Sequence, residues 1–112
     1  MTRNLREFKA DLFRSLASPT RIHILEELRT AGSLTVSELQ RRVGVESSNL
    51  SQHLAVLRAR SLVVAQREGA NVSYSVADAA VFVVLDGARA LFECQLAQQR
   101  QLLAESPEPR QS

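Results

Sequence analysis

The sequence of 112 residues contains one cysteine, no tryptophan and only 4% aromatic residues. The single cysteine, Cys94, excludes an intrachain disulfide framework and suits a reducing compartment. With so few aromatic side chains, a hydrophobic core has to be built from leucine, valine and alanine. No apolar run approaches the ~18 residues of a membrane-spanning helix, and the charged first residues do not resemble a secretory leader. We therefore expect one domain, located in the cytoplasm and without a membrane span.

Positive charge is concentrated in one part of a nearly neutral chain. The formal net charge is only +2, but residues 41–67 hold five arginines against one acid, Glu46. A local basic block suggests a polyanionic partner for one face of the protein. Charge alone leaves open the alternative that this block is an ordinary solvated surface.

Apolar residues at helical spacing predict four helices in the first sixty residues. The first covers 4–17, and Ser18-Pro19 ends it and opens a second that stops at Ala31-Gly32. Thr35 stands three residues before Glu38, a capping-box spacing that opens a third helix, and a fourth follows Gly44. Residues 36–60 therefore read as a helix-turn-helix. The side chains expected to face the core are Ile22, Leu25, Leu28, Val36, Leu39, Val43, Leu50, Leu54 and Leu57.

After residue 62 the pattern changes from helical to alternating. Residues 63–76 read as two strands joined by a turn at 68–71, and the second strand alternates apolar residues with serines. Helical spacing returns over 78–104, and the proline-containing tail 106–112 is expected to be disordered. The expected fold is mainly α with a small β-hairpin wing, in the order α-α-α-α-β-β-α, as a single winged helix-turn-helix domain over 1–105.

The fourth predicted helix begins with short polar side chains. Residues 47–53 read Ser-Ser-Asn-Leu-Ser-Gln-His. A helix fits the major groove of DNA, where each base pair presents its own pattern of donors and acceptors, and reading helices present their amino-terminal residues there. The alternative, helix caps followed by an ordinary polar face, is weaker because serine-rich helix faces form helices poorly.

The residues expected to contact DNA lie on this helix, on the helix before it and on the wing. Side chains that can read bases come from the fourth helix, whereas arginines are expected at phosphates. The set is Ser47, Ser48, Asn49, Ser51, Gln52, His53, Arg58, Arg67, Arg41 and Arg42.

Four segments, 16–25, 34–39, 47–58 and 74–76, taken in this order, resemble the ArsR/SmtB family of winged helix-turn-helix regulators. The similarity covers roughly residues 5–96. The resemblance implies a homodimer that is formed by the first and last helices and binds operator DNA through the fourth helix. It also implies repression of transcription that is relieved by an inducer, often a metal ion.

The sequence supports a dimer independently of this resemblance. The first and last helices carry more apolar residues than a small core and a hairpin can absorb, and large exposed apolar patches usually mark interfaces. A twofold axis would place two reading helices on a palindromic operator, about one DNA turn apart. That both helices only complete the core of one protomer is the alternative. The expected interface residues are Leu5, Phe8, Leu12, Val81, Leu85, Ala88 and Phe92.

The metal-ligand sets that the family would imply are largely missing. The stretch 33–39, where one such site places cysteines, has none, and hydroxyls are poor ligands for thiophilic ions. Of a second set, Asp78 remains, whereas other positions fall on Ala80 and near Leu91 and Cys94. A non-standard transition-metal site at the dimer interface stays open as an alternative. Its weak candidate ligands are Asp78, Asp86, Glu93, Cys94 and His23.

Other signals and other functions are also open at this stage. Cys94 is a candidate redox sensor, although cysteine is more often a small buried hydrophobe. A signal could equally arrive through a partner protein. An enzyme is not expected, because no catalytic constellation or phosphate-binding glycine loop is present. A winged helix that binds only proteins is a further alternative, against which Arg67 on the wing argues.

Overall fold

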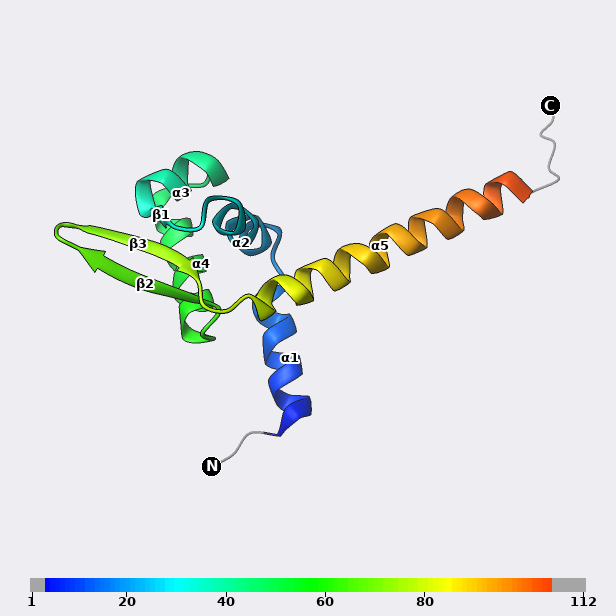
Figure 1. Ribbon diagram of the computed structural model, residues 1–112, viewed down its shortest axis with the longest axis horizontal. Helices are drawn as coiled ribbons and strands as arrows, with labels where there is room; N and C mark the ends of the chain where they lie inside the picture. Colours follow the sequence, from blue (N-terminus) through cyan, green and yellow to red (C-terminus); the bar gives the residue numbers. More distant parts are fainter. Residues whose placement is uncertain (1–3, 106–112) are drawn as a thin grey trace. The chain divides into compact units, whose positions relative to one another are not determined.

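The first part of the chain folds into short helices that begin at capping residues and carry apolar residues at helical spacing (Figure 1). The computed structural model describes residues 4–105 and divides into two compact units, one up to Ala79 and the other from Ala80. Whether 1–105 forms a single domain stays a prediction, and the tail 106–112 lies outside the described residues. The elements are α1 (Leu5–Leu16), α2 (Pro19–Ala31), β1 (Leu34–Thr35), α3 (Val36–Val43), α4 (Ser47–Ala59), β2 (Val63–Glu68), β3 (Asn71–Val76) and α5 (Ala80–Glu105).

Short polar side chains cap the first three helices, at Ser18 and Thr35 as predicted and also at Asn4, which the sequence analysis placed inside the first helix. The Oδ1 atom of Asn4 accepts from the backbone N–H of Glu7 at 2.8 Å and opens α1. Ser18 caps α2 in the same way, with Pro19 in its first turn. At α3 the full capping box forms, because Thr35 accepts from the backbone of Glu38 and the Glu38 carboxylate accepts from the backbone of Thr35.

The three-stranded sheet contains one strand that the sequence analysis missed. Leu34 and Thr35 form β1, which pairs antiparallel with Tyr74 and Ser73 of β3, so that the sheet order is β1-β3-β2. Two residues are too few to show an alternating period, which explains the omission. The hairpin itself is confirmed, but its turn is tighter than predicted, since Glu68 pairs with Asn71. Gly69 supplies the positive φ of 64° that such a two-residue turn requires.

The core of the first unit consists of leucines with Ile24 and Val63. Leu25, Leu28 and the three leucines of α4 are buried as predicted, but Ile22 is half-buried and Ile24 takes the expected place in the core. Among the described residues no alanine is buried, so the expectation of an alanine contribution was wrong. The fully buried members are Ile24, Leu25, Leu28, Leu39, Leu50, Leu57 and Val63.

The second unit begins with α5, a helix of 26 residues. It begins at Ala80 rather than at residue 78 and ends at Glu105, one residue beyond the predicted end. No helix within residues 4–105 is both long and apolar enough to cross a membrane.

Candidate nucleic-acid interface

The buried leucines of α4 determine which of its side chains reach solvent. Leu50, Leu54 and Leu57 recur at intervals of four and three residues and are at most 3% exposed, which fixes one side of the helix in the core. The side chains of the opposite side are therefore exposed. We call Ser47, Ser48, Ser51 and Gln52, all exposed, the reading face.

Of the candidate reading residues, Asn49 and His53 lie on the flank of α4 away from Ser47 and Ser51. Asn49 is exposed, but His53 is half-buried and its Nδ1 atom lies 3.1 Å from Nη1 of Arg21 on α2. Arginine has no acceptor, so the imidazole accepts through Nδ1. His53 is thus bonded to another helix of the protein. The two residues are 32 positions apart, so no local sequence pattern could have revealed the contact.

The other flank of α4 borders a groove of about 530 Å³. Ser51 and Arg58 line it from α4, Val36 from α3 and Tyr74 from β3. Sequence reasoning placed Tyr74 only as a half-buried wing residue, because its position beside α4 depends on the pairing of β3 with β1. The groove therefore adds a phenol to a surface that already carries a hydroxyl and a guanidinium.

The predicted phosphate-binding arginines differ in their surroundings. Arg41, Arg58 and Arg67 are exposed, and within residues 4–105 none of their guanidinium groups makes an ion pair or a hydrogen bond. Arg42 instead pairs with Glu27 of α2 at 3.3 Å, and the same carboxylate lies 3.3 Å from Nε2 of His23. Three unpaired cations are thus carried by α3, α4 and the wing.

Glu38 connects the capping box to the charge at the end of α3. Its bonds from the backbone and hydroxyl of Thr35 lower the pKa of its carboxyl below the ordinary value of 4.5, and Arg41 and Arg42 lower it further. The carboxylate is therefore ionised at neutral pH. Its negative charge also interacts favourably with the positive amino-terminal end of the α3 dipole.

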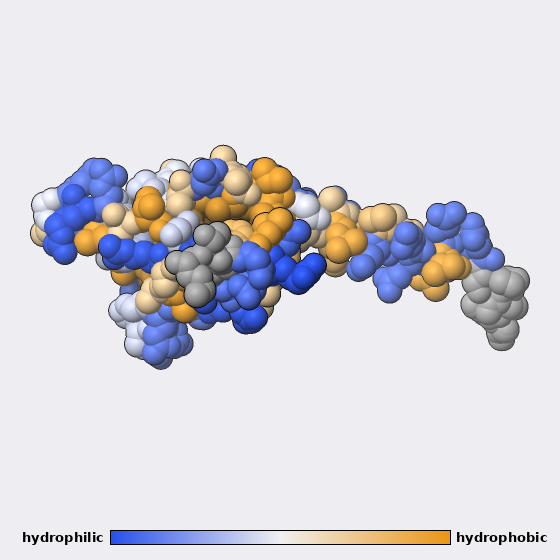
Figure 2. Space-filling view, turned by 90° about the horizontal axis from the view of Figure 1, so that it is seen from below, coloured by the Kyte–Doolittle hydropathy of each residue, from blue (hydrophilic) through white to orange (hydrophobic). Residues whose placement is uncertain are grey.

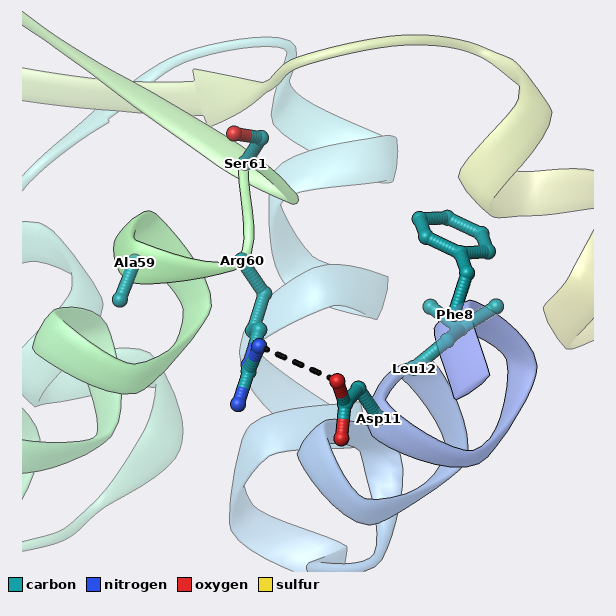
Figure 3. Close-up of a pocket in the computed structure, with 6 residues that line it drawn as sticks. All are labelled: Phe8, Asp11, Leu12, Ala59, Arg60 and Ser61. Carbon is teal, nitrogen blue, oxygen red and sulfur yellow. Dashed lines mark ion pairs between the residues drawn. The ribbon is translucent and has the colours of Figure 1, made fainter. Parts of the chain in front are cut away.

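A cavity of about 250 Å³ separates α1 from the end of α4 (Figure 3). Phe8 and Leu12 form its α1 side, and Ala59 and Ser61 lie on the other side. Asp11 pairs across the cavity with Arg60 at 3.6 Å and, along α1, with Arg14. Together with His53 and Arg21, this pair gives α4 a second polar connection toward α1.

The expected dimer residues of α1 form a stripe that leaves the core. Leu16 is buried, Leu12 is half-buried, and Phe8 and Leu5 are 49% and 66% exposed. The apolar side of α1 thus continues beyond the core of its own unit.

Helix α5 also exposes apolar side chains, which Figure 2 shows as orange atoms between blue ones along that helix. Ala88 and Phe92 are exposed, Leu85 is half-buried, and Val81 is buried. Further along, Leu102 and Leu103 are 69% and 77% exposed. Apolar surface of this kind usually marks an interface.

The candidate metal ligands do not come together in one chain. Among residues 4–105 no three His, Cys, Asp or Glu side chains lie close enough to hold an ion. Cys94 is exposed, so the reading of this residue as a buried hydrophobe does not hold within one protomer. It follows Phe92 by two residues, about 200° around the helix, and so faces away from the apolar stripe. Within the described part of one chain, the donors do not fit a resident metal ion.

Comparisons with known proteins agree with this geometry. A family model described as a helix-turn-helix domain matches residues 16–66. The crystal structure of Rv0081 from Mycobacterium tuberculosis superposes with a TM-score of 0.77 at 40% identity, covering 88% of this chain and 98% of that one. The chain belongs to the ArsR/SmtB family. ArsR/SmtB proteins are transcriptional regulators, a non-enzymatic class, as the sequence predicted.

Other ArsR/SmtB relatives match over a similar range. The HTH-type transcriptional regulator NmtR of M. tuberculosis is 42% identical over 79 residues, which is 70% of this chain and 65% of NmtR. The antimony-specific transcriptional repressor AntR superposes with a TM-score of 0.71 at 31% identity, covering 88% of this chain and 92% of AntR. By sequence, the match to Rv0081 is 48% identical over 77 residues and spans 64% of that regulator's length and 65% of this chain.

Proposed function

We propose that this protein is a homodimeric repressor that binds a palindromic operator through the reading face of α4. The observation that carries the proposal is the exposed reading face, together with three exposed arginines on α3, α4 and β2 whose guanidiniums make no ion pair within residues 4–105. Short hydroxyls and an amide can pair with base edges in the major groove, and free guanidiniums can neutralise phosphates. In the proposal Ser47, Ser48, Ser51 and Gln52 read bases, while Arg41, Arg58 and Arg67 bind phosphates. Asn49 is placed at the edge of the reading face.

Dimerisation extends the length of DNA that the protein can contact. A single helix contacts only a few base pairs, whereas two helices related by a twofold axis contact two half-sites about one DNA turn, roughly 34 Å, apart. The exposed apolar side chains of α1 and α5 support such a dimer, because they have no covering residues in their own units. The proposal assigns these two helices to the interface, as the family resemblance implies.

Repression is proposed from family membership and from the relative AntR, which is a repressor. The antimony response of AntR is not carried over. Soft ions bind thiolates, and this chain has one cysteine, which faces away from the apolar stripe of α5. The proposed signal is therefore a non-metal ligand or a partner protein.

The test is a titration of the purified protein into fluorescent DNA from its own upstream region, with a shuffled duplex of the same composition for comparison. We expect Gln52→Ala to weaken binding to the upstream duplex by roughly 5- to 100-fold, the range for one lost bidentate base contact. Its binding to the shuffled duplex should change little, since phosphate contacts remain. Gln98→Ala removes an exposed glutamine from α5 and serves as the matched control.

The outcomes separate base reading from general attraction. Equal losses of Gln52→Ala on both duplexes would remove Gln52 from base recognition. Equal affinity of the unaltered protein for both duplexes would contradict the proposed function itself.

A further inference from the structure

The guanidinium of Arg21 connects three helices at one point. Its Nε atom donates to the carbonyl oxygen of Ser15 at 2.6 Å, and Nη2 donates to the carbonyl oxygen of Arg14 at 3.4 Å. These carbonyls belong to the last turn of α1, where that of Arg14 also accepts from the backbone N–H of Ala17. The remaining nitrogen, Nη1, donates to Nδ1 of His53 on α4 at 3.1 Å.

The position of His53 makes this contact relevant to the reading face. His53 directly follows Gln52 on α4, so a bond that holds the imidazole also restrains the helix that carries Gln52. The amino-terminal end of α4 has little other polar restraint, since its N-cap residue, Glu46, makes no side-chain capping bond. The buried leucines hold α4 against the core but are apolar and non-directional.

We propose that Arg21 is a positioning residue for DNA binding, which orients the reading face of α4 by donating to Nδ1 of His53, and that protonation of His53 releases this contact and weakens DNA binding. The inference rests on the proposed function. A neutral imidazole with its proton on Nε2 accepts from Arg21, whereas an imidazolium donates from both nitrogens and cannot accept. Protonation therefore replaces a hydrogen bond with two facing donors of like charge.

The surroundings of His53 offer no group that would compensate for this charge. On α4 itself, the side chains one turn away belong to Asn49, Leu50, Val56 and Leu57, none of which is charged. On α1, Asp11 pairs with Arg14 and Arg60. On the packed strand β2, the charged residues are Arg67 and Glu68, next to the hairpin turn.

Helix α2 carries the acids Glu26 and Glu27 and the bases Arg21, His23 and Arg29. Glu27 pairs with His23 and Arg42, and Glu26 and Arg29 are exposed. Within residues 4–105 no carboxylate pairs with His53.

The sign of the pH effect distinguishes this role from direct contact with DNA. A histidine at a phosphate gains charge as the pH falls and binds DNA more tightly. If a histidine must instead accept from Arg21, its protonation weakens DNA binding, because the imidazolium has no acceptor.

The experiment measures affinity for the upstream duplex at about pH 7.5 and about pH 5.5, at fixed salt. We expect the unaltered protein to bind roughly three- to tenfold more weakly at the lower pH, about the net contribution of one ordinary hydrogen bond. His53→Asn places an amide oxygen, which does not titrate, near the position of Nδ1. It should bind more tightly than His53→Leu at the higher pH and show no loss at the lower one.

Three controls keep the result interpretable. The chain has two histidines, so His23→Asn removes the other one and should retain the pH-dependent loss. Nitrogen NMR of the free protein at the higher pH should find His53 as the Nε2–H tautomer. Circular dichroism at both pH values checks that each variant is folded.

The outcomes distinguish this inference from the proposed function. A preference for the upstream duplex at pH 7.5 that is unchanged or stronger at pH 5.5 overturns the role of Arg21 and His53 alone, as does the Nδ1–H tautomer. The absence of any preference at pH 7.5 overturns the proposed function and this inference with it.

Discussion

At the scale of single residues, burial and pairing separate side chains that look equivalent in the sequence. His53 belongs to the same polar run as Ser51 and Gln52, but it is half-buried and bonded to Arg21. Arg42 adjoins Arg41, yet only Arg42 is paired, with Glu27. The residue types of the site could be predicted from the sequence, since its polar run and arginines are local. These partners could not, because they come from helices distant in the chain.

Arg67 provides the test of a phosphate contact. It is exposed on the wing and has no partner in the described chain, so its charge is available to DNA of any sequence. We expect Arg67→Ala to weaken binding to the upstream and shuffled duplexes by similar factors. It should also reduce the slope of log affinity against log salt by about one, because one fewer counterion is released.

Arg100→Ala is the matched control for Arg67, since Arg100 is an exposed arginine of α5. It should leave the salt slope unchanged. A loss confined to the upstream duplex would make Arg67 a base-reading residue instead.

At the scale of elements, the positions of the helices could be predicted because residues near their ends carry local signals. Capping residues act within three or four positions, so Ser18 and Thr35 could be recognised locally. The strand β1 could not, because its two residues become a strand only by pairing with Tyr74 and Ser73. The groove beside α4, which Tyr74 lines, was missed for the same reason.

The capping box of α3 predicts a pH-dependent contribution to stability. The lowered pKa of Glu38 means that its carboxylate stabilises the folded state above its ordinary pKa of 4.5, and that this contribution is lost as the pH falls through the lower folded-state value. Glu38→Gln keeps an acceptor for Thr35 but removes the charge. Denaturant unfolding should find this variant less stable at neutral pH, and the difference should shrink toward about pH 3.

Thr35→Ala is the companion change, because it removes the hydroxyl that caps α3. It should lower the free energy of unfolding by about 1 kcal/mol. A Glu38→Gln variant that is as stable as the unaltered protein at neutral pH would contradict the account of this helix.

The backbone is strained just after the end of α4. Ser61 has a φ of 59°. The backbone N–H of Ser61 donates to the carbonyl oxygen of Arg58 and that of Leu62 to the carbonyl oxygen of Leu57, which together form a Schellman motif. Glycine usually occupies this left-handed position, because L side chains are disfavoured there. Ser61→Gly should therefore raise the free energy of unfolding by about 0.5–1 kcal/mol, with a corresponding rise in Tm.

Ser37→Gly makes the same substitution inside α3, where the backbone is helical. It should lower stability by about 0.5–1 kcal/mol, so that the two variants differ in sign. Destabilisation by Ser61→Gly would show that the serine side chain contributes more than its backbone strain costs.

At the scale of the whole molecule, the proposed recognition of two half-sites requires two copies of the chain. The exposed side chains of α1 and α5 were expected from their apolar spacing, and the structure leaves most of them uncovered. Their pairing across a twofold axis is the part that a single chain does not contain. Symmetry would then impose a definite spacing on the DNA, since both reading faces must enter the major groove on the same side of the duplex.

Footprinting on the upstream DNA, with the stoichiometry of the complex measured in parallel, tests whether two chains read two half-sites. We expect two protected half-sites with centres about 10 base pairs apart, occupied by two protein chains. We also expect Gln52→Ala to abolish both protections at the concentration where the unaltered protein gives them. A single protected site bound by one chain, or uniform protection of any DNA, would contradict the proposed function.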